Sequence, residues 1–166
     1  MNTATARDEK SIVGFRDAIL ALAPEVNPVE AEGVSITAHT TSRRLAREYR
    51  MVGPPAFQNF LIHVGVRERG FCFHWARDIG ARLKELKLKT LVLHWGASFA
   101  GTQQENNCLV VTARGQPFRD GIIIDGWRHA GRLCWRSVRK DTQNEWKEDM
   151  AETASLQNHR PKEEKL

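Results

Sequence analysis

LKELKLKTLVLHW, residues 83–95, contains the point at which the apolar pattern of this chain changes from helical to extended. Up to Lys89, apolar residues recur every three or four positions, which is the period of an amphipathic helix. From Thr90 they form a short continuous run, which is typical of a buried strand. The sequence therefore predicts helices before this point and strands after it.

The first half of the chain contains four segments with a helical spacing of apolar residues. They span approximately residues 12–22, 28–49, 57–64 and 72–86. Asn27, Pro28 and Glu30 form a typical helix start, with a capping side chain, a proline in the first turn and an acid three residues after the cap. Gly65 is a natural left-handed end for the third segment.

The second half contains four short apolar runs separated by turn residues. These predicted strands span residues 90–95, 107–113, 121–127 and 132–138. Short connections between consecutive strands favour an antiparallel meander. The sequence thus predicts an α+β fold in which a helical N-terminal half packs on an antiparallel sheet. We expect one domain over residues 11–146, with residues 1–10 and 147–166 as flexible termini, because charged residues accumulate at both ends.

Composition excludes several classes of protein. The 166 residues are 41% hydrophobic and 27% charged, which suits one soluble globular domain. No apolar run is long enough to span a bilayer, and no apolar signal core follows the polar first ten residues. As given, the chain is therefore expected to be cytoplasmic, and a secreted or periplasmic location would require a leader that has been removed. The net charge of +5 comes from dispersed basic residues, so nucleic acid is not an expected partner.

Three cysteines, none of them in a CxxC pair, do not form a disulfide framework or a typical zinc site. We therefore expect no metal and no cofactor. Cys72 is distinctive because RGFCFHW, residues 69–75, places it at the start of an amphipathic helix. Helix N–H groups there stabilise a thiolate and lower the thiol pKa. The alternative is a small buried side chain on the apolar face of that helix.

Asp125 closes the apolar strand over residues 122–124 and precedes Gly126, Trp127 and Arg128. An acid at the end of a buried strand has two roles that the sequence leaves open. It either orients a catalytic base or forms a turn and pairs with Arg128.

Four motifs follow one another in a characteristic order: PPAFQN at 54–59, RGFC at 69–72, LHWG at 93–96 and IDGWR at 124–128. With them, residues 49–135 resemble the transglutaminase-like branch of the papain-like cysteine hydrolases. Within it they are similar to a bacterial family of uncharacterised proteins, often secreted or lipid-anchored. The resemblance implies a papain-like core with the nucleophilic cysteine at a helix N-terminus.

Transferred residue by residue, the resemblance implies that Cys72 is the nucleophile and Asp125 the orienting carboxylate. The base is expected at position 106, but this chain has Asn106 there, and an amide cannot accept the thiol proton. His94 is a replacement candidate if strand alternation turns it toward Cys72. Its alternative is a half-buried histidine that hydrogen-bonds locally.

The same resemblance implies that Trp75 and Trp127 line the cleft and that Arg128 pairs with the aspartate. It predicts a cysteine hydrolase or acyltransferase that acts on amide bonds of a peptide or protein through a Cys-His-Asp type triad. The replacement of the histidine by Asn106 opens a second interpretation. In it, the domain is catalytically inactive and uses the same cleft to bind a peptide or protein partner.

Overall fold

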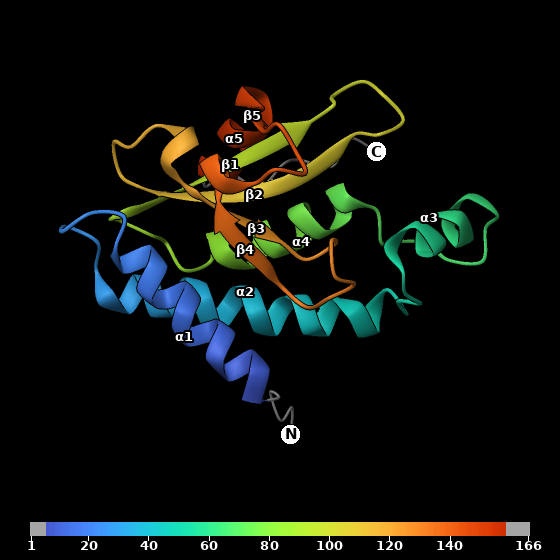
Figure 1. Ribbon diagram of the computed structural model, residues 1–166, viewed down its shortest axis with the longest axis horizontal. Coiled ribbons are helices and arrows are strands. Elements are labelled where there is room, and N and C mark those ends of the chain that lie inside the picture. Colours follow the sequence, from blue (N-terminus) through green and yellow to red (C-terminus); the bar gives the residue numbers. More distant parts are fainter. Residues whose placement is uncertain (1–5, 159–166) are drawn as a thin grey trace.

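The computed structural model describes residues 6–158, and its elements follow the order that the sequence predicts (Figure 1). The helices are α1 (Ala6–Leu20), α2 (Pro28–Glu48), α3 (Pro55–His63), α4 (Cys72–Lys84) and α5 (Met150–Gln157). The strands are β1 (Leu91–Ser98), β2 (Asn106–Ala113), β3 (Ile122–Asp125), β4 (Cys134–Ser137) and β5 (Lys147–Glu148). A mixed α+β fold with a helical N-terminal half is therefore confirmed.

The strands form a single antiparallel sheet in the order β4-β3-β2-β1-β5. In the central pair, Leu91 lies opposite Ala113 and Trp95 lies opposite Leu109. The first four strands form the predicted meander, because each short connection returns the chain beside the strand it has just left. The fifth strand covers the free edge of β1.

The two faces of the sheet carry different cores. Helix α4 lies between the sheet and the α1–α2 pair (Figure 1), and this face holds the main core. It includes Phe15, Val34, Trp75, Ile79, Leu83, Leu93, Trp95, Leu109, Val111 and Ile124. The opposite face holds a smaller core of Cys108, Val110, Ile123 and Trp146. Successive strand residues point to opposite faces, so each residue's place in the alternation decides which core it joins.

The start of α2 is fastened to the start of β1. The Asn27 side chain caps the helix as predicted and accepts the main-chain N–H of Val29 at 2.8 Å. Glu30 does not turn back toward this cap. Its carboxylate instead accepts the N–H groups of Lys89 at 2.6 Å and Thr90 at 2.9 Å, where the helical half passes into the sheet.

The predicted domain boundaries differ from the structure at both ends. Helix α1 begins at Ala6, and its buried Asp8 is held by Arg43 of α2 at 2.8 Å. After residue 146, β5 pairs with β1, and Thr153 of α5 accepts the N–H of Trp95 at 2.9 Å. These end segments are attached to the domain largely by polar contacts. The spacing of apolar residues, on which the predicted boundaries depend, does not reveal such contacts. The rest of the two predicted flexible termini, residues 1–5 and 159–166, lies outside the described residues.

None of the helices between residues 6 and 158 is long and apolar enough to cross a membrane.

We expect the stability of the fold to decrease as the pH falls below about 6.5, the ordinary pKa of histidine. Burial lowers the pKa of His39 and of His74 below the ordinary 6.5. The unfolded chain therefore binds more protons than the native state in this range, and each extra proton costs about 1.4 kcal/mol per pH unit. Urea unfolding at pH 7.5 and 5.5 measures the loss. Equal stability at the two pH values would refute the expectation.

Candidate functional site at Cys72

Cys72 is the first residue of α4, and the segment before it is locked in place. Gly70 has a φ of +130°, which L side chains rarely adopt, and a Cβ there would lie 2.9 Å from Cγ of Gln58. The ring of His74 caps the helix, because its Nδ1 accepts the N–H of Gly70 at 3.1 Å and that of Phe71 at 3.2 Å. The spacing Gly-Phe-Cys thus places the thiol at a helix N-terminus.

The thiol itself is enclosed, because Cys72 as a residue is only 9% exposed. Its Sγ donates to the main-chain oxygen of Glu105 at 3.6 Å and accepts from Nδ2 of Asn107 at 3.6 Å. Burial raises the pKa of the Cys72 thiol, and the N–H groups of Asn107 and Phe73 that face it oppose this rise without cancelling it. The ordinary value is already 9.0, so the group is a neutral thiol near pH 7.

Of the two neighbouring asparagines, the structure brings Asn107 to the thiol and not Asn106. Asn107 is buried on the α4 face of β2, where its Oδ1 also accepts the indole N–H of Trp95 at 2.9 Å. The side chain of Asn106 instead donates to Oδ1 of Asn144 at 2.9 Å. The position that faces Cys72 is therefore one residue later than the resemblance implies.

Asp125 forms a turn and an ion pair. Its Oδ1 accepts the main-chain N–H of Trp127 at 2.9 Å and of Arg128 at 3.1 Å, and its Oδ2 lies 3.2 Å from Nε of Arg128. Ile124 packs in the α4-side core, so alternation turns Asp125 to the other face of the sheet. The side chains of Cys72 and Asp125 thus approach the sheet from opposite faces, although the charge of Asp125 still contributes to raising the pKa of the Cys72 thiol. Their convergence on a shared base stays a prediction.

His94 also points away from Cys72, so the condition for its use as the base, that strand alternation turns it toward the thiol, is not met. Its neighbours Leu93 and Trp95 belong to the α4-side core, and the imidazole lies on the opposite face. There, Nδ1 lies 2.6 Å from Glu148 and Nε2 lies 2.9 Å from Thr112. This is the locally hydrogen-bonded histidine of the alternative interpretation.

A cavity of about 480 Å³ lies beside the thiol, between α3, the start of α4 and the loop that precedes β2. Carboxamide side chains are its most frequent polar lining: Asn59, Gln103, Gln104, Asn106 and Asn107. The lining also includes His63, Phe71, Phe73 and Trp127. In the sequence, only the polar run QQENN at 103–107 indicated this lining. Whether these side chains face a cavity depends on the conformation of the loop, which hydropathy does not predict.

Two buried polar atoms of this cavity lack a hydrogen-bond partner within residues 6–158. They are the donor Nε1 of Trp127 and the acceptor Oδ1 of Asn59. Trp75, the other tryptophan expected in the cleft, is not among the lining residues. It is buried in the main core, and its indole N–H donates to the main-chain oxygen of Gly70 at 3.2 Å.

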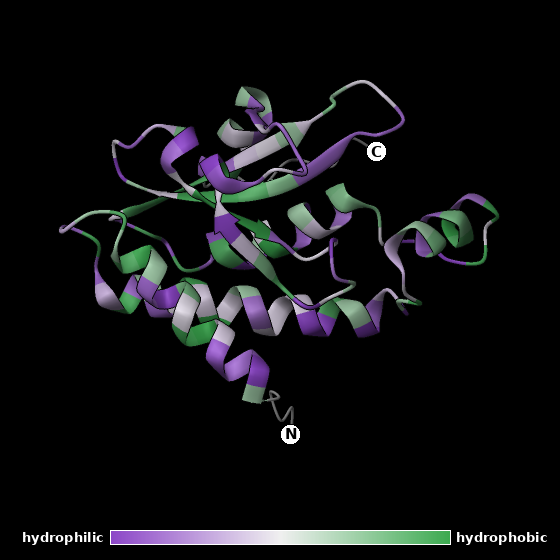
Figure 2. Cartoon of the chain, in the orientation of Figure 1, coloured by the Kyte–Doolittle hydropathy of each residue, from purple (hydrophilic) through white to green (hydrophobic). Residues whose placement is uncertain are grey.

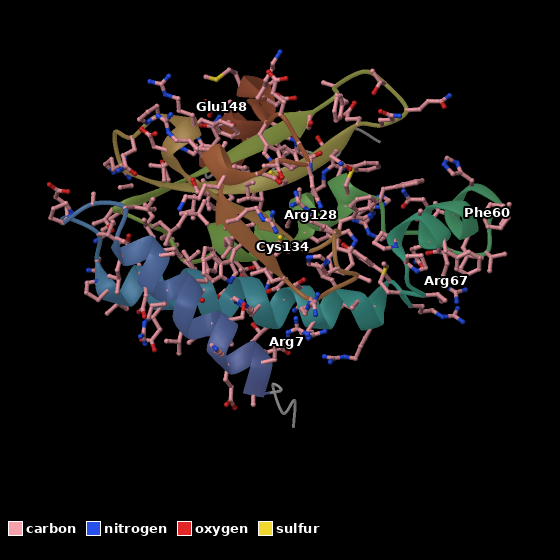
Figure 3. The ribbon with its side chains drawn as sticks, viewed as in Figure 1. Arg7, Phe60, Arg67, Arg128, Cys134 and Glu148 are labelled. Atoms are coloured by element: carbon pink, nitrogen blue, oxygen red, sulfur yellow. The ribbon has the colours of Figure 1, made fainter. Side chains whose placement is uncertain are left out.

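Helix α3 adds an exposed apolar surface next to this cavity. In Figure 1 it projects to one side of the molecule, and Figure 2 shows apolar residues on it. The rings of Phe57 and Phe60 stack 6.2 Å apart, and Phe60 is 56% exposed. Figure 3 shows Phe60 on this projection together with Arg67. An exposed aromatic pair beside a polar cavity is suited to contact a ligand.

Gln58 ties α3 to the site and should be important for stability. It is fully buried, and its amide contacts three main-chain groups: those of Tyr49, Val52 and Arg69. Its side chain is thus fully engaged by the main chain. Gln58→Ala should cost about 3 kcal/mol in urea unfolding, because three polar groups lose their partner. Asn59→Ala is the control and should be nearly neutral, and a comparable loss for both variants would contradict this role.

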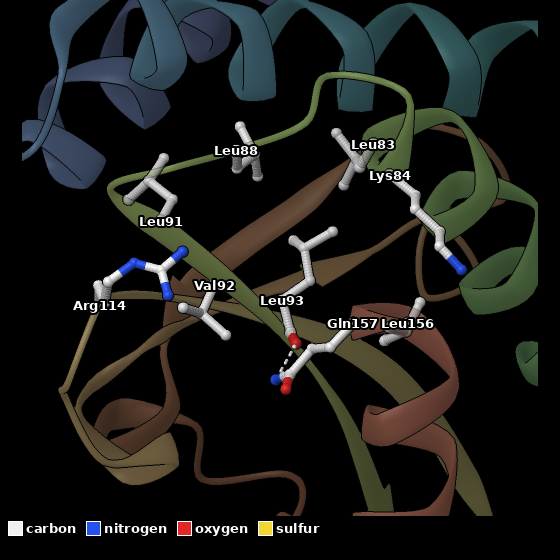
Figure 4. Close-up of a pocket in the computed structure, with 9 residues that line it drawn as sticks. All are labelled: Leu83, Lys84, Leu88, Leu91, Val92, Leu93, Arg114, Leu156 and Gln157. Carbon is white, nitrogen blue, oxygen red and sulfur yellow. Dashed lines mark hydrogen bonds between the residues drawn. The ribbon is translucent and has the colours of Figure 1, made fainter. Parts of the chain in front are cut away.

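Another cavity, of about 220 Å³, lies where α5 meets α4 and β1 (Figure 4). Its cationic side chains are already engaged with main-chain oxygens. Nζ of Lys84 donates to Ser155 at 3.0 Å, and Nε of Arg114 donates to Lys89 at 2.6 Å. The first contact joins α5 to α4, and the second joins the residue after β2 to the segment before β1, so we interpret this cavity as structural.

Comparisons of the chain with protein-family models, with curated proteins and with solved structures found no match. In the part of the chain that the structure describes, no group of three or more His, Cys, Asp or Glu side chains is arranged to hold a metal ion. The functional interpretation therefore rests on the geometry around Cys72.

Proposed function

We propose that the Cys72 cavity binds a peptide segment of a partner protein without forming a covalent bond to it. The observation that carries this proposal is the environment of Sγ, which lies between the main-chain oxygen of Glu105 and the amide of Asn107. An amide cannot take up the thiol proton, so the cysteine has a nucleophile's position at the helix start without a base in contact. The fold resemblance to papain-like hydrolases remains part of this proposal.

The lining of the cavity favours a peptide over a charged ligand. Carboxamides both donate and accept hydrogen bonds, as a peptide group does. The unpartnered N–H of Trp127 matches a peptide oxygen, and the unpartnered oxygen of Asn59 matches a peptide N–H. Each such buried group costs about 1–3 kcal/mol while unpaired, so a ligand that reaches both would be stabilised. Phe57 and Phe60 offer contact to an apolar side chain of the same ligand.

One observation favours a second candidate, a cysteine hydrolase that acts on amide bonds. His63 lines the same cavity and lies exposed at the end of α3. If substrate binding brought it to the thiol, the Sγ proton would pass to its imidazole and the thiolate would attack the amide carbon. The C–N bond would break, the amine would leave with that proton, and water would then hydrolyse the thioester.

A random peptide library separates the two candidates. We expect wild type and Cys72→Ser to retain the same peptides with similar affinity, and mass spectrometry to find them intact and unattached. Trp127→Phe removes the indole N–H together with one ring of the side chain and should weaken binding about tenfold. Trp135→Phe is the matched control, because Trp135 does not line this cavity.

Two results would overturn the binding proposal. One is cleavage of peptides, or an adduct on Cys72, that requires the thiol and is reduced in His63→Ala, which would establish the hydrolase instead. The other is that no peptide is retained by either protein.

A further inference from the structure

We infer that a separate cavity between α1, α2 and the start of β4 binds a phosphoryl group. It has a volume of about 230 Å³ and shares no lining residue with the Cys72 cavity. Arg7, Asp8, Ser11, His39, His129 and Arg132 provide most of its polar lining. Figure 3 labels two residues of the lining, Arg7 near the start of α1 and Cys134 on β4. This inference is independent of the function proposed for Cys72.

The charges of this cavity do not balance. The only carboxylate in its lining is Asp8, which Arg43 already holds through two contacts of 2.8 and 3.0 Å. Neither Arg7 nor Arg132 has a carboxylate partner among residues 6–158. By contrast, several arginines elsewhere do pair with acids, as Arg139 does with Asp120 at 2.6 Å. Within residues 6–158, Arg7 and Arg132 thus line this cavity with no carboxylate partner to offset their charges.

One wall of the cavity is neutral and fixed by hydrogen bonds. Nδ1 of His39 lies 2.8 Å from the main-chain oxygen of Ser35, which can only accept, so this nitrogen carries the proton. Nε2 therefore accepts the hydroxyl proton of Ser11 at 2.9 Å, and Ser11 in turn accepts the indole N–H of Trp135 at 3.0 Å. Because each group already has its partner, this wall does not compete with the arginines for a ligand.

His129 completes the lining on the side of Arg132. Burial, and after it the charge of Arg132, lowers the pKa of His129 below 6.5. Near pH 7 its ring is neutral, and within the described residues it has no hydrogen-bond partner, so it can donate one N–H to a ligand.

These features together define the ligand class. Two guanidinium groups match a dianion in charge, and guanidinium forms paired hydrogen bonds to phosphate oxygens. The cavity accommodates more than one phosphate ion, which suits a small phosphate monoester. A bound dianion next to His129 should raise the pKa of that imidazole, because it stabilises the protonated ring.

The test is an NMR titration of the His129 ring with inorganic phosphate at constant ionic strength. We expect saturation and a rise in the His129 pKa of at least about half a unit. Arg7→Gln and Arg132→Gln should each weaken phosphate binding about tenfold. Arg139→Gln is the matched control and should bind as wild type does. A parallel titration with phenyl phosphate distinguishes the two sources of a phosphoryl group. If the ligand is an organic monoester, phenyl phosphate should bind more tightly than free phosphate.

The inference is overturned if binding does not saturate up to about 50 mM phosphate, because a specific site of this kind would have a dissociation constant below that concentration. It is also overturned if Arg139→Gln weakens binding as much as the other variants do, or if acetate binds equally well. Should Arg132→Gln fail to fold, the exposed Arg7→Gln decides the outcome alone, because Arg7 lies on the surface.

Discussion

Replacement of Asn107 by histidine should make the Cys72 thiol reactive at neutral pH, whereas the same replacement at Asn106 should not. Nδ2 of Asn107 lies 3.6 Å from Sγ and 3.3 Å from the Glu105 carboxylate. An imidazole in this place can take the thiol proton, and the carboxylate can stabilise the resulting imidazolium. We expect the thiol pKa to fall by about two units and alkylation by iodoacetamide at pH 6.5 to accelerate 10- to about 100-fold.

Asn106→His is the matched control for this experiment, since its side chain is directed to Asn144. The thermal unfolding midpoint of both variants shows whether each is folded, because Asn107 also accepts the indole N–H of Trp95. Equal alkylation rates in the two folded variants would mean that residue 107 does not control the thiol. Acceleration in Asn106→His alone would restore the position implied by the family resemblance.

Arg128→Met should destabilise the protein by about 3–5 kcal/mol, because it leaves the buried Asp125 without its cation and Asp141 with only the more distant Arg136, at 3.8 Å. Arg128 lies between Asp125 at 3.2 Å and Asp141 at 2.8 Å, and its side chain is 9% exposed. Asp141 also accepts the indole N–H of Trp146 at 2.7 Å, so this network holds the segment before β5 against the sheet. Urea unfolding of the wild type and the variant measures the loss.

The pH dependence of this loss gives an independent check. Burial alone would raise the pKa of Asp141, but the hydrogen bonds from Arg128 and Trp146 outweigh it and lower the pKa below 3.8. The ionised Asp141 carboxylate therefore contributes to the free energy of unfolding above pH 3.8. This contribution is lost as the pH falls toward the lowered pKa of Asp141 in the folded state. The pair Arg69–Asp78, whose side chains are 43% and 30% exposed, is the control, and Arg69→Met should cost less than about 1 kcal/mol. A similar, small loss in both variants would contradict the role of the buried network.

The fold could be predicted largely from the sequence because its elements have clear periods. The change at Thr90 marks the boundary between helices and strands, and Asn27 caps α2 as expected. Helix α5 was not predicted. Its sequence MAETASLQ offers few apolar residues, and Thr153 joins it to β1 through a hydrogen bond that no hydropathy pattern reveals.

The site was harder to predict because side-chain direction in a strand alternates with every residue. In β2, a difference of one position decides which asparagine faces the thiol. Asn107 contacts Cys72, whereas Asn106, the position that the resemblance implies for the base, is directed to Asn144. The same alternation places His94 and Asp125 on the face away from Cys72. Motif order places these residues on neighbouring strands, but it does not determine which face each side chain occupies.

The most direct test of the central proposal is the pH dependence of Cys72 alkylation in the unaltered protein, followed by peptide mapping. The proposal rests on a thiol without a base, whose pKa is raised above 9.0 by burial. We therefore expect the Cys72 rate to rise steadily with pH up to 9, with no plateau at lower pH, and to stay below that of a free cysteine. A plateau of high reactivity below pH 7, lost in His63→Ala, would show a thiolate–imidazolium pair and contradict a purely binding role.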